Sequence, residues 1–277
     1  MKINNNKQFI RCTVFILFIV FFGISGCTVK DNANTHKKKK RLLIFCGITM
    51  VHPIQKIADI IEKQFNCKIT IIQGGSEDIY QSLKLSKKGD LYLPGSDSYR
   101  TKHFGEGLLS DYIYVGYNQM ALIVPKGNPK NIKADLNCLI NPKYSVSIGN
   151  ADSSSVGKQA RKILTKAGIY DKVLLNAFKV SSDSRTMNNL LKDGSAEIIF
   201  NWRATAYFPE NRNKMDALCL DASIAPKKKL LINLTTCCKH EDIARAFMRY
   251  AGSEKGQIIF NDYGFLDKIG VARKIER

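Results

Sequence analysis

The sequence predicts an α/β fold of two lobes, each a mostly parallel sheet flanked by helices, hinged by two strands that cross between the lobes. Short β-rich apolar runs alternate with segments of helical periodicity, which is typical of strand–helix–strand units. Two longer β-rich runs, near 111–126 and 230–236, bracket one block of this alternation. We therefore expect the chain to leave the first lobe, build the second and return. A single doubly wound domain is the alternative, but its length would be unusual.

The first lobe is predicted to cover residues 41–117 and 232–277. Pro53 opens its first helix, because proline suits the first turn and the isoleucines that follow recur at helical spacing. Strands are expected at 41–46, 68–73 and 90–93, and helices at 53–65, 77–87, 241–251 and 254–263.

The second lobe is predicted to cover residues 118–231, where the alternation resumes. Its strands are expected near 144–148, 177–180 and 197–201, and its helices near 154–167 and 184–192. In open α/β sheets, ligands bind at the carboxyl ends of strands. A cleft between two hinged lobes is therefore the expected place for a binding site.

The N-terminus predicts export and a lipid anchor. Residues 1–26 read as a signal peptide, with a basic start and an apolar run at 12–22 that is too short to span a membrane. Ile24-Ser25-Gly26-Cys27 resembles a lipobox, so Cys27 is the expected lipidation site. An ordinary cleavage site beside an unmodified Cys27 is the alternative. Residues 27–40 are polar, end in four lysines and are expected to form a flexible tether facing the periplasm or the cell exterior.

The exported chain is basic. Of the 43 Lys and Arg residues, three lie in the signal peptide, which leaves 40 against 24 Asp and Glu. This charge suits an anionic partner. The basic residues are scattered, with no basic helix and no aromatic-interleaved strand, so no nucleic-acid partner is expected.

Six cysteines remain once Cys12 leaves with the signal peptide and Cys27 is assigned to lipid; they are Cys46, Cys67, Cys138, Cys219, Cys237 and Cys238. Their spacing matches no zinc pattern, so neither a metal site nor a cofactor is expected. Most are expected to be small buried side chains. A bridge from Cys219 to Cys237 or Cys238 is left open.

Four predicted strand-to-helix junctions carry hydroxyls or small residues; they are 47–49, 74–76, 152–157 and 181–185. Each places free backbone N–H groups and the positive end of a helix dipole at the end of a strand. Such groups together bind a tetrahedral oxyanion without a counter-charge. Ser, Thr and Asp are also ordinary N-caps. It is the even division of the four junctions between the two lobes that favours a binding site.

Segments in order along nearly the whole exported chain resemble the extracellular solute-binding proteins of ABC transporters, nearest to the molybdate/tungstate-binding type. These segments are LLIFCGITM, QGGSEDIYQSL, GDLYLPGSDSY, YNQMALIVPKGNP, GNADSSSVGKQARKIL, SSDSRTMNNLLKDGSAEIIFNW and ARAFMRYAGSEKGQIIFNDYGF. The last is the most similar, but many solute-binding families share it, so it supports the fold more than the ligand. The resemblance implies a two-lobed periplasmic-binding-protein-like fold of type II.

The resemblance also implies the ligand contacts. It places Thr49, Ser76, Ser155, Val156 and Ser184 at the ligand, with Asn201 and Trp202 at the end of the strand that follows. Gly75, Arg185 and Arg203 are further possible contacts. The molybdate type often carries a tyrosine where this chain has Asn201 to Arg203. The arginines suit a more strongly charged ligand or a solvent-facing role, and both interpretations are left open.

The predicted function is that of a solute-binding lipoprotein of an ABC importer, which captures a small oxyanion of the molybdate or tungstate type between its lobes. It is expected to act as a monomer with a membrane permease as partner. Phosphate, sulfate, phosphonate or ferric iron in the same fold, or a sensory binding lipoprotein, are the alternatives. An enzyme is not expected, because the sequence has no Gly-x-Ser-x-Gly elbow, P-loop or zinc-binding helix motif.

Overall fold

The computed structural model describes residues 39–277 except Ser153, and these residues belong to one compact unit. The predicted signal peptide, the lipidation site Cys27 and most of the predicted tether lie outside the described residues. In the part that is described, no helix combines the length and the hydrophobicity needed to cross a membrane.

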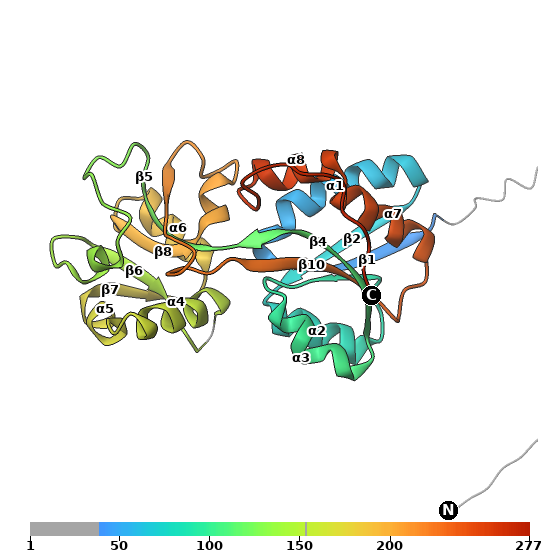
Figure 1. Cartoon of the computed structure of the whole chain (residues 1–277), viewed down its shortest axis with the longest axis horizontal. Helices are drawn as coiled ribbons and strands as arrows, with labels where there is room; N and C mark the ends of the chain where they lie inside the picture. The colour runs from blue at the N-terminus through green and yellow to red at the C-terminus, as the bar shows by residue number, and fades with distance from the viewer. Residues whose placement is uncertain (1–38, 153) are drawn as a thin grey trace, which may run out of the picture. The chain divides into compact units, whose positions relative to one another are not determined.

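The first sheet contains strands from both ends of the described chain: β1 (Arg41–Gly47), β2 (Lys68–Gly74), β3 (Leu91–Leu93), β4 (Leu109–Asn118) and β10 (Lys228–Thr235). Their order in the sheet is β2-β1-β3-β10-β4 (Figure 1). Strand β10 runs antiparallel to both of its neighbours, whereas β1 pairs in parallel with β2 and β3.

The second sheet repeats this arrangement with the middle of the chain: β5 (Met120–Pro125), β6 (Val146–Gly149), β7 (Ala177–Ser181), β8 (Ile198–Trp202) and β9 (Met215–Cys219). Its order is β7-β6-β8-β5-β9, and β5 is the antiparallel strand. Two mostly parallel sheets confirm the predicted fold class. The residue boundaries assigned to the two lobes remain a prediction, and below each lobe means one sheet with its helices.

Helices pack on both faces of the first sheet. On one face, the core is shared with α1 (Val51–Phe65), α7 (Glu241–Gly252) and α8 (Glu254–Asp262). On the other, Phe45 and Tyr92 pack against α2 (Ser76–Ser86). The second sheet has one large core, shared with α4 (Ser155–Lys166), α5 (Tyr170–Asn176) and α6 (Ser184–Lys192).

Several predicted elements differ from those observed. Helix α1 begins at Val51, so Pro53 lies inside its first turn, where its missing N–H costs no hydrogen bond. The run predicted as one strand at 111–126 is two strands, β4 and β5, which belong to different sheets. They separate at Gln119, whose side chain donates to the carbonyl groups of Leu220 at 3.1 Å and Ala225 at 2.9 Å.

Short elements were not predicted, because they offer too few residues for a period. They are α3 (Ser98–His103), α5 and β9. The sequence left open a disulfide from Cys219 to Cys237 or Cys238. In the structure, all six described cysteines, including these three, are unpaired.

Candidate ligand-binding cleft

The carboxyl ends of strands from both sheets converge on one cavity of about 190 Å³, here named the central cavity. From the first lobe it is lined by residues 47–50, 74–76 and 78, together with Gly95 and Asn118; from the second it is lined by residues 154–156 and 182–184, together with Trp202. The four hydroxyl side chains expected at the ligand, Thr49, Ser76, Ser155 and Ser184, therefore all line the same cavity. Gly75, Val156 and Trp202 line it as well.

Helix N-termini supply the backbone donors of this cavity. Helix α4 is capped by Ser154, whose hydroxyl accepts from the N–H of Gly157 at 3.1 Å. Helix α6 is capped by Asp183, whose carboxylate accepts from the N–H of Thr186 at 2.8 Å. Each cap serves the third residue of its helix, so the earlier first-turn N–H groups, such as those of Ser155 and Ser184, have no acceptor within the helix. They lie at the positive end of the helix dipole.

The start of α2 differs from these two, because its N-cap residue Gly75 has no side chain to act as a cap. Ser76, the first residue of α2, is buried, and its hydroxyl oxygen accepts from the N–H of Gly95 at 2.9 Å. This bond ties together the loops after β2 and β3. A side-chain hydrogen bond also joins the Ser76 hydroxyl to Tyr99.

Carboxylates also line the central cavity, namely those of Asp78 and Asp183. Burial opposes ionisation of Asp183, but hydrogen bonds from the N–H and hydroxyl of Thr186 and from the hydroxyl of Ser182 lower its pKa overall. Asp183 is therefore charged at neutral pH, with its oxygens already engaged in capping α6. The cavity thus combines neutral donors with a local negative charge that a bound anion must tolerate.

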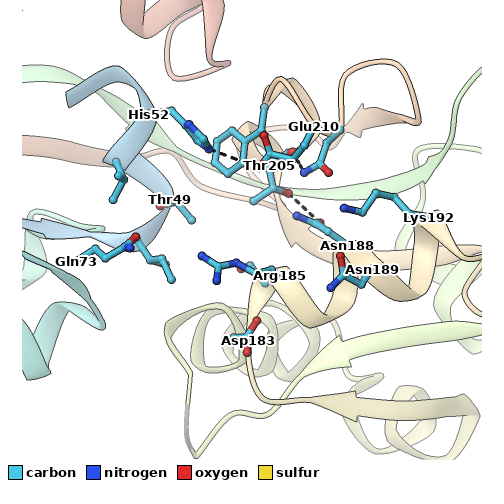
Figure 2. A pocket seen from close by; sticks show the side chains of 15 residues that line it. Thr49, His52, Gln73, Asp183, Arg185, Asn188, Asn189, Lys192, Thr205 and Glu210 are labelled. Atoms are coloured by element: carbon cyan, nitrogen blue, oxygen red, sulfur yellow. Dashed lines mark hydrogen bonds and ion pairs between the residues drawn. The ribbon is translucent and has the colours of Figure 1, made fainter. Parts of the chain in front are cut away.

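Two neighbouring cavities share residues with the central cavity. The larger, named the large cavity, has a volume of about 420 Å³ and shares Ile48, Thr49, Asp183 and Ser184 with it. Arg185 and Lys192 contribute positive charge there, and His52 pairs with Glu210 at 3.5 Å (Figure 2).

The other neighbour, named the lysine cavity, has a volume of about 250 Å³ and shares Ser76, Gly95, Ser155 and Trp202 with the central cavity. It is lined by Lys158, Lys162 and Lys228. The central cavity, whose own lining has no Lys or Arg, therefore lies between two basic compartments. Such an arrangement raises the local concentration of anions.

Unsatisfied polar atoms gather in this cleft. Among the described residues, three buried side-chain atoms have no hydrogen-bond partner: Asn118 Oδ1, Gln159 Nε2 and Asn211 Oδ1. Asn118 lines the central cavity, Gln159 the lysine cavity and Asn211 the large cavity. Native proteins rarely leave buried polar groups unpaired, so these three atoms indicate partners supplied by a ligand or by water.

Two predicted contacts are not at these cavities. Asn201 is fully buried, and its carboxamide donates to the Ser184 carbonyl at 3.1 Å and to Asn188 at 2.9 Å. These two hydrogen bonds tie β8 to α6. Arg203 is buried too, but its guanidinium donates to the carbonyl of Gly264 and to Asp267. The third departure is smaller: Arg185 lines the large cavity rather than the central one.

Several cleft residues were not predicted from the sequence. Asn118 stands beside Gln119 between the apolar runs of β4 and β5, and polar residues in such a run are a usable signal. Lys192 and Asn211 carry no such signal, because each lies in an unremarkable polar stretch. Among the described residues, no group of three or more His, Cys, Asp or Glu is placed to hold a metal ion.

A cleft lined by strand ends and helix N-termini from two sheets defines a two-lobed binding protein for a small solute. The chain belongs to the bacterial extracellular solute-binding protein family, whose sequence profile matches residues 42–266. Among relatives, it is 22% identical over 263 residues to YvgL of Bacillus subtilis, which bears the name of an ABC transporter substrate-binding lipoprotein; the match covers 93% of this chain and 99% of YvgL.

Solved structures share the fold at low identity. The substrate-binding domain of a molybdenum ABC transporter from Clostridium difficile superposes with a TM-score of 0.68 at 20% identity, covering 83% of this chain and all of that one. The periplasmic molybdate-binding protein of Azotobacter vinelandii also gives 0.68, at 13% identity over 82% of this chain and 99% of its own. At these identities the similarity establishes the fold, and structures titled as thiamin-binding or iron-bound share it too.

Proposed function

We propose that this protein is the solute-binding lipoprotein of an ABC importer and that it captures a small oxyanion, of the molybdate or tungstate type, in the central cavity. Thr49 and Ser76 act from the first lobe, and Ser155, Val156 and Ser184 act from the second. The observation that carries the proposal is that these residues, spread between positions 49 and 184 of the sequence, line one cavity beside three helix N-termini. Uncharged donors of this kind bind oxyanions without proton transfer.

Capture is proposed to work by closure of the lobes on the ligand. Each lobe supplies only part of the donor set, so the oxyanion has its full set of hydrogen bonds only when both lobes contact it. Its differential affinity therefore shifts the population toward the closed form. The membrane permease recognises that form, and no catalytic step is involved.

The wider setting is proposed on the same basis. The N-terminal segment directs export, Cys27 carries the lipid, and the mature protein acts as a monomer at the outer face of the membrane. The family and the lipoprotein name of the Bacillus subtilis relative support export and a lipid anchor, and the molybdate-binding name of the Azotobacter protein supports an oxyanion as solute. The basic compartments beside the central cavity support an anionic solute.

A ligand panel tests the proposal. The exported chain from Cys27 onward is titrated calorimetrically with molybdate, tungstate, sulfate, phosphate and ferric citrate, after a thermal-shift screen. At least one oxyanion is expected to bind with micromolar or tighter affinity and to raise the melting temperature. Binding of ferric citrate alone overturns the oxyanion assignment.

A further inference from the structure

The large cavity offers more room than a bare oxyanion uses. Its volume of about 420 Å³ lies within the roughly 300–1,000 Å³ range of sites for small organic ligands, whereas the central cavity, at about 190 Å³, lies below it. The two cavities share four lining residues and therefore adjoin. A ligand whose head group occupies the central cavity can extend into the large one.

One face of α6 gives the large cavity its charge. Arg185, Asn188, Asn189 and Lys192 follow the i, i+3, i+4, i+7 spacing of a single helix face, and all four line the cavity. Figure 2 shows Arg185 extending from the start of α6 toward Gln73, and Lys192 lying at the other end of the helix. About two helical turns separate the two cations along α6, so a single small anionic group contacts one of them, and Arg185 is the one that follows the shared lining residues Asp183 and Ser184.

The cations and carboxylates that line this cavity are equal in number, two of each, but they differ in their partners. Its two carboxylates are engaged: Asp183 caps α6, and Glu210 pairs with His52. Arg185 and Lys192, in contrast, form no ion pair within the described part of the chain. Two cations without counter-ions favour an anionic group in the ligand, and guanidinium binds carboxylate or phosphate oxygens through two parallel hydrogen bonds.

The remaining lining fits the rest of an organic molecule. Asn211 is 2% exposed; its Nδ2 donates to the Thr205 carbonyl at 2.8 Å, while its Oδ1 has no partner. An unpaired acceptor calls for a donor, such as a hydroxyl group of the ligand or a water molecule. Val51 and Phe208 line the same cavity and offer apolar contact for carbon atoms.

We infer that the preferred ligand is a small organic phosphate or phosphonate with a second anionic group, its tetrahedral head in the central cavity and its second anion beside Arg185. The inference rests on the proposed function, since it keeps the oxyanion head where that function puts it. It narrows the class of ligand from inorganic oxyanions to phosphate or phosphonate groups that are part of an organic molecule.

The test compares ligands that differ only in the second anion. Calorimetry with the exported chain uses phosphonoacetate and phosphoglycolate, with methylphosphonate as the matched probe that lacks the carboxylate, and with molybdate and phosphate as inorganic probes. Phosphonoacetate or phosphoglycolate is expected to bind about 10- to 100-fold more tightly than methylphosphonate, as a charge-assisted hydrogen bond predicts. It is also expected to bind more tightly than either inorganic anion.

Variants locate the effect. Arg185→Gln is expected to weaken binding of the carboxylated probes about tenfold and to leave methylphosphonate unchanged, and Lys192→Gln, two helical turns further along α6, is expected to weaken it less. Arg249→Gln, at an exposed position on α7, is the matched control and is expected to change neither. Molybdate or phosphate binding more tightly than the carboxylated probes overturns this inference and leaves the proposed function standing. No binding by any of these anions overturns both.

Discussion

Arg203 and Asp267 form an ion pair at the junction of the two lobes, with Arg203 Nη1 donating to Asp267 Oδ1 at 2.7 Å. Arg203 directly follows β8 of the second sheet, whereas Asp267 lies after α8, which packs on the first. The Tyr117 hydroxyl and Lys227 Nζ donate to the same carboxylate, and they belong to the two segments that cross between the sheets. One carboxylate therefore gathers donors from the second lobe and from both crossings.

The charges in this group depend on one another. Burial disfavours the charged form of Arg203, but the hydrogen bond to Asp267 raises its pKa overall. Burial likewise opposes ionisation of Asp267, and donation by Arg203, Lys227 and Tyr117 lowers its pKa. Both groups stay charged through the neutral range.

Removing the arginine is expected to cost more stability than removing the carboxylate. Arg203→Gln leaves the Gly264 carbonyl without its donor and removes one of the three donors to Asp267, so the free energy of unfolding should fall by about 2–3 kcal/mol. Asp267→Asn should cost about 1 kcal/mol, because Asp267 is half exposed and Arg203 keeps its carbonyl partners. Urea denaturation measures both. Lys40→Gln, which removes an exposed pair with Asp242, is the control and should change little. If the free energy of unfolding falls equally in all three variants, the Arg203–Asp267 pair stabilises the junction no more than an exposed pair does.

Ser76→Ala is expected to weaken oxyanion binding by about 1–3 kcal/mol, because one oxygen of the ligand loses its donor and the loop holding Gly95 loses an acceptor. Thr49→Val, which keeps the shape of the side chain, tests the other first-lobe hydroxyl in the same way. Calorimetry with the tightest ligand of the panel gives the affinities. If neither variant changes the affinity, the assignment of the central cavity is wrong.

Asp183→Asn is expected to change the affinity for the anion while changing the free energy of unfolding only slightly. The amide still caps α6, so the free energy of unfolding should fall by only about 0.5 kcal/mol. Loss of a negative charge that lines the central cavity should tighten binding of an anion several-fold. Weaker binding in this variant, measured by calorimetry beside the unmodified protein, would show instead that Asp183 accepts a hydrogen bond from the ligand.

Acid stability is expected to depend on Glu77, the second residue of α2. Burial opposes its ionisation, but Lys102, Gln81 and His103 donate to its carboxylate and lower its pKa to about 2. A depressed pKa contributes stability that is present above the unfolded-state value and is lost as pH falls toward the folded-state value. Between about pH 5 and 2, Glu77→Gln should therefore flatten the loss of stability, by about 1 kcal/mol after solvent screening.

This pH dependence is measured by urea denaturation at several pH values, with Glu210→Gln as the comparison. Glu210 is more exposed and has a single partner, His52, at 3.5 Å. If the two variants give the same pH profile as the unmodified protein, the Glu77 cluster does not control acid unfolding.

Cys27→Ser is expected to release the protein from the membrane fraction into the soluble exported fraction. A serine at that position cannot form the thioether through which the lipid is attached. The apolar signal peptide is removed on export, so the mature protein then lacks its membrane anchor. Cell fractionation and labelling with a radioactive fatty acid measure the outcome. Label on the Cys27→Ser protein would contradict the lipobox interpretation.

Much of the fold could be predicted because its signals are local. Helix α6 begins and ends at the predicted residues, and the predicted strands overlap β1, β2 and β3 closely. Hydrophobic periodicity and capping residues act within a few positions along the chain. They can therefore be recognised without knowing which distant residues pack nearby. The short β9 and α5 were not predicted, because β9 forms by pairing with β5 and α5 packs on the core of the second sheet.

The sequence by itself determined which hydroxyls and glycines follow the strands, and a common topology then brings strand ends together. Only the tertiary structure decided which way the side chains of Asn201 and Arg203 turn, since neighbours from distant segments hold them. The same holds for the cations of the large cavity. Spacing and polarity are encoded locally, whereas the partner that a buried polar group finds depends on how the whole chain packs.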